Sequence, residues 1–190
     1  GIKGNSTMEM TGGTITGNTA EYGGILVGTY STNYTMQNNF SNPAHYYSKG
    51  ILNLKGGTIS NNTAAVLGGG IAVNGTGILT MDGGTISGNK APFGGGIGVV
   101  DYLTSPDGQR FGEARWRGFF PAAVTINGGL ITGNEATMTA VTSQITDPNA
   151  ENGVGGGLYV ASKEVYVNGG EFTNNTAGKQ GGGIYVASVP

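Results

Sequence analysis

One short phrase recurs along this chain and restricts the fold more than any other feature. The heptapeptide GGTISGN at residues 83–89 returns almost unchanged at 56–62 and 12–18, and more divergent copies stand at 128–134 and 169–175. Gly57 and Gly84, the second glycines of adjacent copies, are 27 residues apart. A unit of this size cannot bury its apolar side chains alone, so successive units must stack on one another as a solenoid.

Each unit carries the same three apolar segments. An alternating pair precedes the glycines, one large apolar residue follows them, and a second alternating pair ends the unit. In the last unit these are Val165 and Val167, then Phe172, then Ile184 and Val186. Alternation with a period of two indicates strands with one buried face. The pattern predicts an all-β fold, a right-handed parallel β-helix of about five coils with three short strands per coil, in which equivalent side chains form vertical files.

An asparagine stands five residues after the second glycine of every unit. Asparagine tolerates left-handed backbone geometry and can bond to turn backbone, and stacked copies can form a ladder of side-chain amides. The sequence therefore predicts a structural asparagine ladder, made of Asn18, Asn62, Asn89, Asn134 and Asn175.

Composition narrows the class of protein. Glycine supplies 39 of the 190 residues, well above the usual share of about 7%. The net charge of −2 offers no electrostatic footprint for nucleic acid or an anionic membrane. There is no cysteine, and no apolar run reaches the ~20 residues of a spanning helix. We expect one β-helix domain over residues 1–190, a fragment of a longer repeat protein, because the chain starts and stops at the same phase of the repeat.

The segment GGEFTNNTAGKQGGGIYV at residues 169–186 resembles the repeat of the chlamydial-type polymorphic outer-membrane proteins. That repeat pairs an FxxN phrase with a GGA/GI phrase, and residues 172–175 and 182–184 supply both. The other four units have isoleucine in place of the phenylalanine, and they are more similar to adhesin-like right-handed β-helix proteins of bacterial and archaeal cell surfaces. The resemblance implies a secreted, surface-displayed passenger or adhesin stalk, and it brings over no catalytic residue.

Three insertions interrupt the repeat, at about residues 28–50, 101–122 and 137–153. In a solenoid such loops form the specific surface while the coils serve as scaffold. The second insertion holds the single tryptophan and all three arginines, residue types that are frequent at binding hot spots. Tyrosines of the first insertion could stack on sugars, and in both insertions the alternative is ordinary packing onto the column. The possible ligand contacts are Tyr46, Tyr47, Tyr102, Arg110, Phe111, Arg115, Trp116 and Arg117.

No catalytic, cofactor or metal site is predicted. His45 is the only histidine, and a zinc site needs three or four convergent ligands. Asp101 and Asp107 lie in one insertion beside the arginines, but no two carboxylates recur at one strand position on adjacent coils. Asp82 has Lys55 and Asn127 as its neighbours in the column and is expected to be a turn residue.

The sequence favours a non-enzymatic, extracellular adhesin or structural stalk segment of the cell surface. Its partners would be a protein or glycan of a host or neighbouring cell, bound through the inserted loops. One alternative is a polysaccharide-active β-helix enzyme, a lyase or hydrolase, which would need two carboxylates within catalytic reach. Another is a subunit that self-associates into filaments through open coil ends. Threonines beside the central isoleucine also resemble the ranks of ice-binding solenoids.

Overall fold

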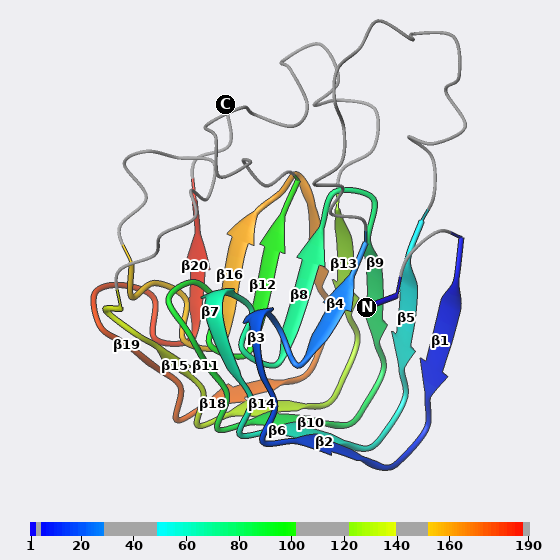
Figure 1. The fold of residues 1–190 in the computed structure, drawn as a ribbon, viewed down its shortest axis with the longest axis horizontal. Helices are drawn as coiled ribbons and strands as arrows, with labels where there is room; N and C mark the ends of the chain where they lie inside the picture. Colours follow the sequence, from blue (N-terminus) through cyan, green and yellow to red (C-terminus); the bar gives the residue numbers. More distant parts are fainter. Residues whose placement is uncertain (3–4, 29–48, 102–121, 140–151, 188–190) are drawn as a thin grey trace, which may run out of the picture.

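The computed structural model describes residues 1–2, 5–28, 49–101, 122–139 and 152–187, and this part of the chain is made of β-strands and turns. Four parallel five-stranded sheets run along the column, and each coil contributes one strand to each sheet (Figure 1). The first sheet contains β1 (Thr7–Met10), β5 (Ile51–Leu54), β9 (Ile78–Met81), β13 (Ala123–Ile126) and β17 (Glu164–Val167). The second contains β2 (Thr14–Thr16), β6 (Thr58–Ser60), β10 (Thr85–Ser87), β14 (Leu130–Thr132) and β18 (Glu171–Thr173). The third contains β3 (Thr19–Tyr22), β7 (Thr63–Leu67), β11 (Lys90–Ala91), β15 (Glu135–Ala136) and β19 (Thr176–Ala177). The fourth contains β4 (Ile25–Val27), β8 (Ile71–Asn74), β12 (Ile97–Val100), β16 (Leu158–Ala161) and β20 (Ile184–Val186).

The register of these sheets confirms the predicted parallel β-helix. In the second sheet Ile86 pairs with Ile59 on one side and with Ile131 on the other. Ile131 in turn pairs with Phe172, the one phenylalanine in this file. Equivalent residues of successive units therefore lie directly above one another, as the repeat requires.

The three strands expected in each coil belong to the first, second and fourth sheets. The third sheet adds a fourth short strand, which the alternation did not indicate. Its strands are only two to five residues long. In the middle coils one alanine, such as Ala91 or Ala136, supplies the buried side chain at its start, so the sequence offers too few apolar positions there to display a period of two.

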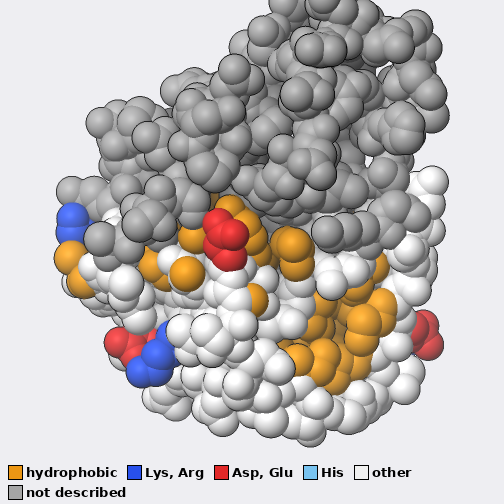
Figure 2. All heavy atoms as spheres, viewed as in Figure 1, with side chains coloured by type: hydrophobic (Ala, Val, Ile, Leu, Met, Phe, Trp, Pro, Cys, Tyr) orange, Lys and Arg blue, Asp and Glu red, His pale blue; other side chains and the backbone are white. Residues whose placement is uncertain are grey.

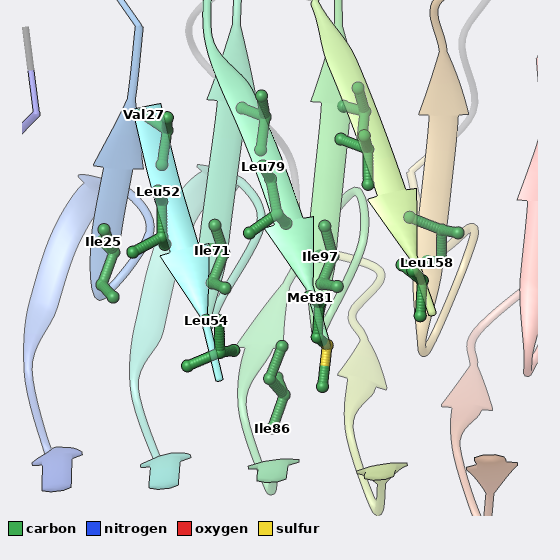
Figure 3. Packing of buried hydrophobic residues seen from close by; sticks show 14 of the residues in the cluster. Ile25, Val27, Leu52, Leu54, Ile71, Leu79, Met81, Ile86, Ile97 and Leu158 are labelled. Carbon is green, nitrogen blue, oxygen red and sulfur yellow. The ribbon is translucent and has the colours of Figure 1, made fainter. Parts of the chain in front are cut away.

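The interior of the column is a single apolar core (Figure 3). Inward side chains of the first, second and fourth sheets meet there, and Leu52, Leu79, Ile86 and Ile97 are fully buried. Burial of each such side chain contributes about 1.5–3 kcal/mol.

A second apolar cluster covers the outer face of the fourth sheet. Leu67, Phe93 and Val154 pair in a file of bridges beside it, and the ring of Phe93 meets that of Tyr159 edge to face at 5.2 Å. Tyr159 stacks in turn on Tyr185 at 6.0 Å. The middle strands of this sheet are consequently buried on both faces, an arrangement usual for parallel sheets.

The glycines of the repeated phrase have a backbone reason. The second glycine of each copy has a positive φ between 84° and 94°, at Gly13, Gly57, Gly84, Gly129 and Gly170. Side chains with a Cβ rarely adopt this conformation, so every coil needs glycine at the corner between its first two strands.

Among the described residues, no helix is long and apolar enough to cross a membrane.

Candidate functional site

The predicted asparagines lie one above another at the corner between the second and third sheets. Asn89 shows the bonding of an internal position. Its Nδ2 donates to Asn134 Oδ1 at 3.0 Å and to the Ile59 carbonyl at 2.9 Å. Its Oδ1 accepts from the backbone N of Asn62 at 2.9 Å and from Asn62 Nδ2 at 3.0 Å. The same pattern links Asn18 to Asn62 and Asn134 to Asn175.

The hydrogen bonding of these amides, like their position, gives them a structural role. Asn62, Asn89 and Asn134 are fully buried, and their donors and acceptors are used within the column. A buried amide whose hydrogen bonds are satisfied stabilises the fold and has no spare group for a ligand.

The insertions leave the column at two corners. The first lies between β4 and β5 and the second between β12 and β13, so both connect the fourth sheet to the first. The third lies between β15 and β16, where the third sheet leads into the fourth. The proposed contact residues fall outside the described residues, as does His45, and they stay predictions: Tyr46, Tyr47, Tyr102, Arg110, Phe111, Arg115, Trp116 and Arg117.

The two ends of the second insertion are joined to each other and to the next coil. The backbone N of Ala122 donates to Asp101 Oδ1 at 3.2 Å, and Ser162 Oγ donates to the Ala122 carbonyl at 2.6 Å. Burial raises the pKa of the Asp101 carboxyl, because it disfavours the charged form, while donors on Ser162, Ala122 and Lys163 offset part of the rise. Sequence patterns gave no sign of this network, because Asp101, Ala122 and Ser162 are far apart along the chain.

On the face of the column shown in Figure 2, charged side chains are few and much of the surface is polar, but patches of hydrophobic side chains are exposed as well. The threonines of the second sheet face outward, and hydroxyls of adjacent coils bond to each other, as Thr173 does to Thr132 at 2.9 Å. Two exposed ion pairs, Lys55–Glu9 and Lys90–Glu135, each span 2.7 Å. The bond to Glu9 raises the pKa of the Lys55 ammonium.

Asp82 is the turn residue that its neighbours predicted. Asn127 Nδ2 donates to Asp82 Oδ1 at 2.8 Å, and Asn168 Nδ2 donates to Asn127 Oδ1 at 2.9 Å. This exposed polar file follows the corner between the first and second sheets, and its groups bond mainly to one another.

An apolar hollow of about 200 Å³ lies at the last coil, lined mainly by the inward side chains of β16, β17 and β20. Ser162 and Lys163 are the polar residues in its lining. A ligand pocket normally adds several convergent polar groups to an apolar wall, and this lining lacks them. Over the described ranges, no three side chains of His, Cys, Asp or Glu are placed to share a metal ion.

The comparison with protein families bears on the last coil. Residues 169–187 match the Chlamydia polymorphic membrane protein repeat, which confirms the resemblance found in the sequence. Neither the curated proteins nor the solved structures contain a significant match to the chain. The matched segment contains β18, β19 and β20, with Phe172 in the central file of the second sheet. This coil is therefore similar to the polymorphic membrane protein repeat, and the four coils stacked on it have the same architecture.

Proposed function

We propose that the chain is a non-enzymatic segment of an extracellular, surface-displayed adhesin. The column supplies length and stiffness, and the loops inserted between coils bind a protein or glycan on a host or neighbouring cell. The observation that carries this proposal is the match of residues 169–187 to a repeat of polymorphic membrane proteins.

The construction of the column supports a scaffold role. The buried asparagines of the ladder bond to one another and to backbone within the column, and its internal apolar side chains are packed against one another. Specific recognition must then come from side chains that are not used in the packing and hydrogen bonding of the coils. The insertion at 101–122 is the richest source, because it holds Trp116 and three arginines, and such residues dominate binding energy at many interfaces.

The test compares binding by the whole chain and by two variants, on a glycan array and on cultured cells. Trp116→Ala removes the tryptophan of the second insertion and is expected to lower binding at least tenfold, the loss typical of a hot-spot aromatic. Tyr166→Ala is the matched control, since Tyr166 is an aromatic residue of β17 that is 57% exposed on the column itself. This control should bind like the wild type.

Two outcomes would contradict the proposal. If the wild-type chain binds neither glycans nor cells, the adhesin function is wrong. If the chain releases soluble oligosaccharides when it is incubated with acidic polysaccharides, the carbohydrate-active enzyme replaces the adhesin as the proposed function. Equal losses in both variants would assign binding to the column and not to the second insertion.

A further inference from the structure

The two ends of the second insertion are joined by a hydrogen bond that is partly buried. Asp101, the last described residue before it, and Ala122, the first after it, are joined by the hydrogen bond from the Ala122 backbone to the Asp101 carboxylate. The third insertion has a comparable bond, from Asn152 Nδ2 to the Thr139 carbonyl at 2.9 Å, but that bond is exposed to water. Ala122 is fully buried and Ser162 is 7% exposed, and the bond between Ala122 and Asp101 is partly buried.

A residue of the following coil completes the connection. Ser162 Oγ donates to the Ala122 carbonyl at 2.6 Å and accepts from the backbone N of Glu164 at 3.4 Å. The backbone N of Asp101 donates to the Ala161 carbonyl at 3.2 Å, and that of Ala123 donates to the Gly77 carbonyl at 3.0 Å. The insertion thus starts and ends on backbone that is bonded to the coil before it and the coil after it.

We propose that Asp101 and Ser162 are positioning residues for the insertion at 102–121, fixing the separation and direction of its two ends on the column. The inference rests on the proposed function in one respect only: the reason for fixing the ends of this insertion would be to present its binding side chains from a rigid base. Holding a binding loop at both ends lowers the entropy lost when it meets a partner.

The charge of Asp101 is compatible with this role at acidic and neutral pH. Both a carboxylate and a carboxylic acid can accept the Ala122 N–H, so protonation leaves the joining bond in place. Lys163, in the following coil, lowers the pKa of the Asp101 carboxyl electrostatically. An amide at position 101 keeps one acceptor oxygen, and Asp101→Asn should therefore preserve the connection.

The chain contains its own probes for a test. Trp116 is the only tryptophan, and the three arginines, which trypsin cleaves, lie in the same insertion. In Asp101→Ala we expect lower fluorescence anisotropy of Trp116. Tryptic cleavage after these arginines should become about fivefold faster, the change in local opening that corresponds to one lost hydrogen bond. Asp101→Asn should restore both values toward the wild type.

The control is Asp82→Ala, the same substitution at an exposed turn where Asp82 accepts one side-chain hydrogen bond. It should leave both signals unchanged. Ser162→Ala should change them in the same direction as Asp101→Ala, and the double variant should show less than the sum, because both residues act on Ala122. If Asp101→Ala does not fold, Ser162→Ala and its comparison with Asp82→Ala carry the test.

Wild-type anisotropy and cleavage in both Asp101→Ala and Ser162→Ala would overturn the inference, and so would an equal response to Asp82→Ala. The measurement needs no ligand. A chain that binds nothing but responds as expected would therefore refute the adhesin function and leave the positioning role intact.

Discussion

Replacement of one ladder asparagine tests the stacking of coils most directly, and Asn89 is the position to change. It is fully buried in the middle coil, and its side chain takes part in four hydrogen bonds. In Asn89→Ala the backbone N of Asn62 and the carbonyl of Ile59 lose their partner on this side chain. Water cannot easily replace these bonds, because the site is closed by the coils above and below.

The expected cost follows from the groups left without partners. Each buried backbone group without a hydrogen bond costs about 1–3 kcal/mol, so the two together predict a loss of about 2–6 kcal/mol in the free energy of unfolding. A folded domain has a total stability of only about 5–15 kcal/mol, so this is a large fraction. For a chain of this length the middle of that range lowers Tm by roughly 10 °C.

Thermal and urea denaturation followed by circular dichroism would measure the loss, and Asn18→Ala supplies the control. Asn18 occupies the first position of the ladder and is exposed, so water can replace the bonds that its side chain donates to Asn62 and Thr16. We expect a loss below about 1 kcal/mol there. If Asn89→Ala costs no more than Asn18→Ala, the ladder does not stabilise the column.

Three further predictions follow from single contacts. A Cβ at Gly98 would lie 2.4 Å from Leu67 Cδ1, so Gly98→Ala should destabilise the fold by about 1–3 kcal/mol in urea denaturation. Gly12→Ala, with open space around the new methyl group, should cost less than the Gly98 variant. Because the folded protein holds the Asp101 proton more tightly than the unfolded chain, stability from this carboxyl falls as the pH rises from 3.8 through the folded pKa. Asp101→Asn should flatten the stability profile in that window, and a steeper profile would contradict the raised pKa. Lys90→Ala, which breaks an exposed ion pair, should cost at most about 1 kcal/mol, and a double-mutant cycle repeated in 1 M salt should show no coupling with its partner.

The strands of the first, second and fourth sheets and their stacking could be predicted, because both the spacing and the alternation of the repeat indicate them. The spacing of the phrase sets the length of a coil, and the alternation of residues such as Leu79 and Met81 sets which side chains face inward. Any slip by one residue would expose the apolar face, so the register was fixed as well.

The outer cluster and the third sheet could not be predicted. Leu67 and Phe93 stand in segments with no alternation, and they are buried only because the chain turns back over the outer face of the fourth sheet. A buried position of this kind depends on where a corner directs the next strand, which a local pattern does not contain.

In the candidate site too, some features could be predicted from the sequence and others could not. The sequence by itself determined the coil, its core and the asparagine file, since each arises from a short pattern repeated at a fixed distance. Only the tertiary structure joined Asp101, Ala122 and Ser162, which are far apart along the chain and bond through single contacts that the repeat does not contain. The physical reason is that the alternation of buried and exposed side chains is present in the local sequence of every unit. The hydrogen bonds between the two ends of an insertion form only once the coils have stacked.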